Sequence, residues 1–149
     1  MFLELNLQNV LVLISAELAV FGWRIVREIS LAEANRRVWF PINDYMNLLG
    51  AVSLLIFCVV LPLSRRMAGI SAAYAFPKIS NAVFSVALVM LVFYPISMIA
   101  HYGLLNRKGR DRFLRKDRRA YPYCPTQEWV VYGVGIICAA GSFVLVYMR

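Results

Sequence analysis

Glu17 is the residue whose type and place in the chain point most directly to chemistry. It is an ionisable side chain inside the apolar run from Val10 to Trp23. A carboxyl group at membrane depth is costly, so it is expected to face protein or a wet cavity and to have a partner or a task. Two interpretations stay open: a carboxylate that carries protons or binds a cation, and a structural carboxyl group that is hydrogen-bonded inside a helix bundle or at a subunit interface.

Helical phase gives Glu17 polar neighbours. At 100° per residue, Asn6, Glu17, Arg24 and Glu28 lie within about 40° of one another, on one stripe of the first apolar helix. Arg24 and Glu28 are one turn apart and are expected to pair. Because Arg24 is about 10 Å further along the axis, Glu17 is expected either to find a partner on another helix or to stay protonated through desolvation. Asn47 of the second apolar segment is the expected neighbour of this stripe.

A second polar set lies near the end of the third apolar segment. Tyr94, Ser97 and His101 are spaced three and four residues apart and therefore share a helix face. We interpret them as a packed polar face in which the histidine has a local hydrogen bond. No carboxylate of the same helix is spaced to orient His101 for catalysis. A membrane-embedded transferase that acts on lipophilic substrates near Tyr94 and His101 is the least favoured alternative.

No metal or cofactor is expected. His101 is the only histidine, so the chain cannot supply the two histidine ligands of a bis-histidine haem. The three cysteines, Cys58, Cys124 and Cys138, have no CxxC spacing. Because no nucleotide, metal or nucleophile motif is present, we do not expect an autonomous enzyme.

A strongly basic segment follows the third apolar run. Its thirteen residues contain eight lysines and arginines, Arg107, Lys108, Arg110, Arg112, Arg115, Lys116, Arg118 and Arg119. The simplest role is to hold the loop in the cytoplasm. Contact with anionic lipids or an acidic partner is the alternative, at about 1 kcal/mol per basic side chain near the surface. Nucleic acid binding is not expected, since no recognition fold fits in this loop.

The elements that position these residues are membrane helices. Apolar residues make up 61% of the 149-residue chain, above the roughly 45 to 50% of soluble domains. Four stretches reach the roughly 20 residues that cross a bilayer. We predict an all-α integral membrane protein, a bundle of four transmembrane helices in a single domain, residues 1–149. Its spans are about 5–26, 44–64, 80–104 and 129–147, and its basic cytoplasmic loop is 106–128.

The first connection is predicted to contain a short interfacial helix. Ser30 and Glu33 have capping-box spacing, which predicts a new helix from Leu31 to Phe40 that ends before Pro41. Asn43 or Asp44 is then expected to cap the second span.

Charge predicts the orientation of the bundle. Twelve of the sixteen lysines and arginines lie in the first and third connections. The positive-inside rule therefore places both termini outside and these two loops in the cytoplasm. The expected location is an integral membrane, with the bacterial inner membrane favoured.

Small residues predict close helix contacts. Gly135, Ala139 and Ser142 share one side of the fourth span, a small-xxx-small spacing that lets backbones approach closely within one chain or between chains. In the second span, one side likewise has small residues suited to close helix contact: Gly50, Ala51 and Cys58. A homo-oligomer or a complex with a partner membrane protein is therefore expected, besides contact with the lipid bilayer.

Two short stretches resemble known families. Ile14-Ser-Ala-Glu17-Leu-Ala-Val resembles the first helix of the small multidrug resistance transporters, whose first-span glutamate exchanges protons for cationic drugs; the likeness implies a coupling role for Glu17. Asn43-Asp44, with the length and four spans, resembles the membrane-associated glutathione transferase group. That family's glutamate three residues after the asparagine is replaced here by Met46, and its arginine-alanine pair by Phe40-Pro41. The chain is assigned to neither family.

The leading hypothesis is a small non-enzymatic membrane subunit. It would oligomerise or assemble into a larger membrane complex through spans two and four, and present a basic cytoplasmic face to lipid or protein. The alternative hypothesis is a proton-coupled transporter or channel for a small molecule or ion, with Glu17 as the coupling carboxylate.

Overall fold

The computed structural model of the protein describes residues 6–35, 42–69, 75–101, 105 and 125–149, and this part of the chain is helical without a strand. Its elements are α1 (Leu7–Asn35), α2 (Ile42–Leu54), the π-helical segment η1 (Leu55–Val60), α3 (Leu61–Met67), α4 (Ala75–His101) and α6 (Pro125–Met148). Within the described residues, four stretches are long and apolar enough to cross a membrane: Leu7–Arg27, Asp44–Met67, Lys78–His101 and Thr126–Met148. The predicted all-α integral membrane fold is confirmed.

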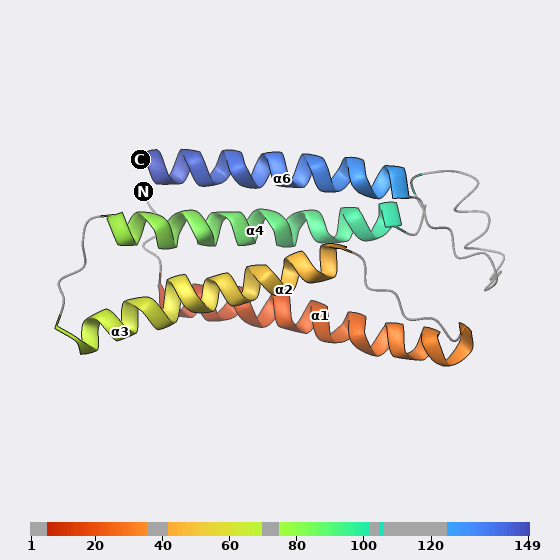
Figure 1. Ribbon diagram of the computed structural model, residues 1–149, viewed down its shortest axis with the longest axis horizontal. Helices are drawn as coiled ribbons and strands as arrows, with labels where there is room; N and C mark the ends of the chain where they lie inside the picture. Colours follow the sequence, from red (N-terminus) through yellow and green to blue (C-terminus); the bar gives the residue numbers. More distant parts are fainter. Residues whose placement is uncertain (1–5, 36–41, 70–74, 102–104, 106–124) are drawn as a thin grey trace.

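The helices lie side by side as a row (Figure 1). The order across the row is α1, α2, α4 and α6, and the chain runs up and down through it. The start of α1 and the end of α6 lie at the same end of the molecule. At the other end α1 and α4 finish and α2 and α6 begin. We call this second end the polar end and the first the apolar end.

α6 is the peripheral helix of the row. It packs along α4, and among the described elements no other helix makes a comparable contact with it. Only 11% of its membrane span is buried, against 22 to 28% in the other three spans. Most of the surface of α6 is therefore open to lipid or to another protein.

The apolar end has a hydrophobic core. Its buried residues come from α1, α2, η1 and α4, and they are Val10, Leu13, Ile14, Leu54, Cys58 and Ala87. Burial of apolar side chains does not by itself drive association between helices in lipid, because lipid tails are equally apolar. Close packing and hydrogen bonds must therefore hold the row together.

The second span changes helix type because it contains a proline. Leu61 N–H donates to Ile56 C=O, five residues back, so the chain forms a π-turn there. In the same register the Phe57 carbonyl would accept from residue 62, but Pro62 has no N–H. The Ser80 hydroxyl of α4 donates to Phe57 C=O instead, at 2.8 Å. The Cys58 thiol donates in return to Ser80 C=O, at 3.4 Å. The proline thus frees a carbonyl that joins the second and third spans.

The prediction that a new helix starts at Leu31 is wrong. α1 continues without interruption through Ser30 to Asn35. The Ser30 hydroxyl donates to Val26 C=O, one turn back in the same helix, at 2.9 Å, and so does not cap a new one. The rest of the predicted interfacial helix, residues 36–40, lies outside the described residues.

Candidate functional site

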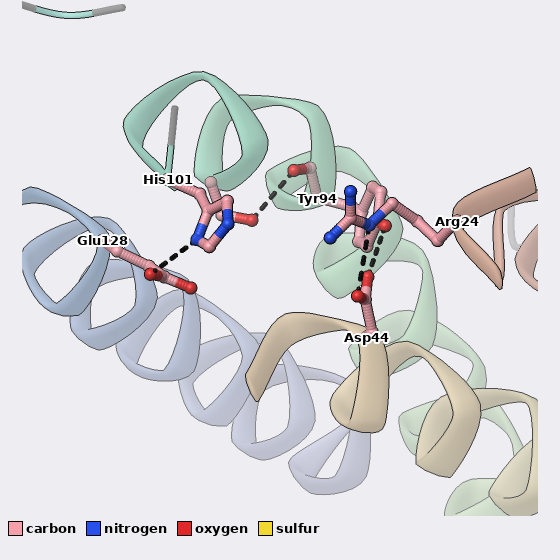
Figure 2. Close-up of polar contacts among 6 residues, drawn as sticks. Arg24, Asp44, Tyr94, His101 and Glu128 are labelled. Carbon is pink, nitrogen blue, oxygen red and sulfur yellow. Dashed lines mark hydrogen bonds and ion pairs between the residues drawn. The ribbon is translucent and has the colours of Figure 1, made fainter. Parts of the chain in front are cut away.

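A buried ion pair joins the first three helices of the row at the polar end. Arg24 of α1 and Asp44 of α2 are 3.2 Å apart, Nε to Oδ2, and both side chains are fully buried. The Tyr94 hydroxyl of α4 donates to Asp44 Oδ1 at 2.6 Å, so both carboxylate oxygens are used (Figure 2). Asp44 lies in the first turn of α2, where the helix dipole favours a negative charge. The three residues hold α1, α2 and α4 in one register.

A second polar pair joins α4 to α6. His101 Nδ1 lies 3.0 Å from Glu128 Oε2, and His101 is buried while Glu128 is partly buried. On the same face of α4, the Ser97 hydroxyl donates to Tyr94 C=O at 2.9 Å. Tyr94, Ser97 and His101 are all buried, on the shared face that their spacing predicts. The partner of His101 is therefore the Glu128 carboxylate on the neighbouring helix, and this contact links α4 to α6.

Glu17 lies deeper in the membrane span than the ion pair, and its side chain is fully buried. Neither carboxylate oxygen has a hydrogen-bond partner among the described residues. The carboxyl group lies against Gly50 of α2. A Cβ at position 50 would be 2.9 Å from Glu17 Oε1 and 3.2 Å from Oε2, so a larger residue there would require the carboxyl group to shift.

Asn47 is the neighbour of Glu17 on α2, one turn from Gly50. Its Nδ2 donates to the backbone carbonyl of Glu17 at 2.7 Å, while its own Oδ1 is buried and has no partner among the described residues. Asn47 also lines a cavity of about 10 Å³ with Tyr94, Ser97 and Tyr132. A volume of this size has room for about one water molecule. Three buried acceptor oxygens on two side chains thus stand without a donor in this part of the bundle.

Other predicted site residues lie elsewhere. Asn6 does not join the bundle contacts: it is exposed, and its Oδ1 accepts from Gln8 N–H at the start of α1, as an N-cap. The predicted pair of Arg24 with Glu28 is not tested, because the Glu28 side chain lies outside the described part of the structure. Arg24 contacts Asp44. The eight basic residues of the loop, 107–119, also lie outside the described residues.

The small residues of the fourth span face α4. Gly135 is buried against the Phe93 ring, with 3.4 Å between Phe93 Cδ1 and a Cβ placed at Gly135. Ala139 is buried too, and the Ser85 hydroxyl of α4 lies 3.4 Å from the Ser142 hydroxyl. This stripe is therefore used for packing inside the protomer.

Sequence reasoning missed three residues of the site. It treated Asp44 only as a helix cap, Gly50 only as a packing residue, and did not consider Glu128. One signal was available in the sequence. Asp44 and Glu128 lie at the start of the second and fourth spans, and Arg24 and His101 lie at the end of the first and third. Antiparallel neighbours bring such positions to one level, but the sequence does not say which helices are neighbours.

The site offers no ready metal centre. No cluster of three or more histidine, cysteine, aspartate or glutamate side chains is found in the part of the chain that the structure describes. The arrangement can do two things chemically: fix helices by buried polar contacts, and hold one buried carboxyl group at Glu17. No family model, no curated protein and no solved structure matches this chain.

Proposed function

We propose that this protein is a non-enzymatic integral membrane subunit that oligomerises or joins a larger membrane complex through the outer side of α6. One observation carries the proposal. α6 packs along α4 and leaves the rest of its surface uncovered. A transmembrane helix held by a single neighbour is available for a further one, and contact between helices in lipid depends on such packing.

The outer side of α6 also has the residues for a close helix contact. A Cβ placed at Gly133 or at Gly141 meets no atom within 4 Å. Ile137 lies between them in sequence, four residues from each, and is 72% exposed. The two glycines thus leave open space on either side of an exposed apolar side chain, against which a second helix can pack. The small residues of the second span serve a different purpose, because Gly50 and Ala51 face the protomer's own interior.

The polar interior supports a subunit more than an enzyme. The cavity beside Tyr94 and Ser97 measures about 10 Å³, whereas sites for small organic ligands usually measure about 300 to 1,000 Å³. His101 and Glu128 contact each other across two helices, which stabilises the row. We further propose, from the charge distribution, that the polar end is cytoplasmic and that the basic loop contacts anionic lipid there.

Cys138 allows a direct test of assembly. It is an exposed free cysteine of α6, while Cys58 is buried and its thiol is hydrogen-bonded to Ser80. In a Cys124→Ser background, a photo-activated crosslinker attached to Cys138 in native membranes should give a covalent product with a second copy or with another membrane protein. Mass spectrometry then identifies the product.

A matched pair of glycine substitutions supplies the control. Gly141→Leu on the outer side of α6 should reduce the crosslinked product and the assembled fraction. Gly22→Leu on α1, where a Cβ also meets no atom within 4 Å, should leave both unchanged. If the wild-type chain gives only lipid adducts and runs as a monomer in mild detergent, the proposed function is wrong.

A further inference from the structure

We propose that the Glu17 side chain is a proton-binding site inside the bundle, and that it exchanges its proton with water through the polar end alone. This inference is independent of assembly through α6. Because the carboxyl group is fully buried by the protomer's own helices, a partner chain on the outer side of α6 does not reach it. Glu17 therefore has a role that the subunit proposal does not use.

The immediate surroundings of the carboxyl group select a proton. An ionised carboxylate without a hydrogen-bond donor or a counter-charge is very costly in an apolar interior. Both oxygens lack a donor among the described residues, and Gly50 closes one side of the site. Arg24 is seven residues further along α1, about 10 Å by helical rise, and is paired with Asp44. A proton removes the negative charge without requiring new ligands.

The two directions from Glu17 along the bundle differ in chemistry. Toward the apolar end, the carboxyl group is followed by the packed side chains of Leu13, Ile14 and Leu54. Toward the polar end lies Asn47, whose unpartnered Oδ1 is an acceptor for a water molecule, and the cavity that it shares with Tyr94. The small cavity and the unpartnered Asn47 oxygen thus lie on the polar side of Glu17, whereas the buried hydroxyl and thiol on the apolar side are hydrogen-bonded to each other's chain segments.

Among the described residues, the charged and titratable groups near this route lie at the polar end. α1 contributes Arg24, α2 contributes Asp44 and α4 contributes Tyr94 and His101; from α6 come Glu128 and Tyr132. On the apolar side, the buried core cluster contains the Cys58 thiol, which donates to Ser80 C=O. Figure 2 shows Arg24, Asp44, Tyr94, His101 and Glu128 at this end.

The step itself is a simple proton transfer. A hydronium ion that enters from the polar end gives one proton to a Glu17 carboxylate oxygen and leaves as water. One O–H bond breaks, one forms, and the charge of the site changes from −1 to zero. The reverse step returns the proton to water at the same end.

Infrared difference spectroscopy of the purified full-length protein in liposomes tests the proton site. The carbonyl stretch of a neutral carboxylic acid should be present at neutral pH, should shift on transfer to D₂O, and should be absent in Glu17→Gln. Glu17→Asp should keep a shifted band, which shows that loss in the Gln variant is not loss of fold. Glu128→Gln, the matched change at the partly exposed carboxylate, should leave the band unchanged.

The route is tested by the rate of exchange. Asn47→Leu should slow the D₂O shift of the Glu17 band, whereas Leu54→Ile in the apolar core should not. The proposal is overturned if Glu17→Gln removes no band, or if the band never shifts in D₂O. It is also overturned if added Na⁺ abolishes the band at constant pH, since the site then takes a metal cation. None of these readouts depends on crosslinking through Cys138.

Discussion

Replacement of Asp44 by asparagine should be the most destabilising single change at the polar end. Asp44 Oδ2 lies 3.2 Å from Arg24 Nε, its Oδ1 accepts from Tyr94 at 2.6 Å, and the Arg24 and Asp44 side chains are fully buried. Asparagine has nearly the same shape, but it removes the negative charge that pairs with Arg24 Nε. Breaking a buried pair in this way costs about 3–5 kcal/mol.

Two companion variants separate charge from hydrogen bonding. Tyr94→Phe removes one hydrogen bond to a charged group and keeps the ion pair, so it should cost about 1.5–3 kcal/mol. Replacing both Arg24 and Asp44 by leucine removes both charges together, and such exchanges are often neutral or stabilising. The double variant should therefore be more stable than Asp44→Asn alone, although it changes more atoms.

Equilibrium unfolding in mixed detergent micelles, followed by tryptophan fluorescence, measures these free energies. The expected order of loss is Asp44→Asn first, Tyr94→Phe second, and the double leucine variant last. The reasoning is refuted if Asp44→Asn costs less than Tyr94→Phe, because loss of the Arg24–Asp44 ion pair would then not be the main cost. A double variant as unstable as Asp44→Asn would show that Arg24 and Asp44 contribute by shape and not by charge.

Three further predictions follow from contacts elsewhere in the chain. Ser80→Ala should lower the free energy of unfolding by about 1–3 kcal/mol in the same assay, because it leaves the partly buried Phe57 carbonyl without the Ser80 donor. Ser80→Thr, which keeps the hydroxyl, should recover part of the loss. Gly50→Ala should raise the free energy of unfolding less in the wild type than in a Glu17→Ala background. In the wild type the gain in helix propensity of about 1 kcal/mol is opposed by the Glu17 carboxyl group, whose Oε1 would lie 2.9 Å from the new Cβ. Equal effects in the two backgrounds would contradict that close contact. Neutralising the basic residues of 115–119 should weaken binding to anionic liposomes by about 1 kcal/mol per residue, with neutral liposomes as the control, and unchanged binding would leave the loop with a topological role.

The positions of the spans could be predicted because length and apolar character are local properties. The inward direction of Glu17 and Arg24 also follows from local information, since both lie on the polar stripe of one helix. The end of the first helix was not predictable in the same way. Ser30 and Glu33 fit a capping box, but Ser30 bonds to Val26 within α1, and the sequence pattern does not distinguish these two uses of a serine.

The pairings between helices depend on the order of the row, and no pattern within one helix reveals that order. Arg24 finds Asp44, and His101 finds Glu128, because α1 lies beside α2 and α4 beside α6. The π-turn before Pro62 is a partial exception. A proline inside an apolar span signals a freed carbonyl, but only the structure shows that Ser80 supplies its donor.

The positions of the two hydrogen-bonded contacts on α4 have a mechanical consequence. The helices form two antiparallel pairs, α1 with α2 and α4 with α6, and polar bonds fasten one pair to the other near opposite ends of α4, at Ser80 and at Tyr94. Together with the packing of α4 against α2 and η1, these two contacts fix the position of the second pair along the first. Because α6 is attached through α4, the same two contacts also set the level of α6 relative to α1 and α2.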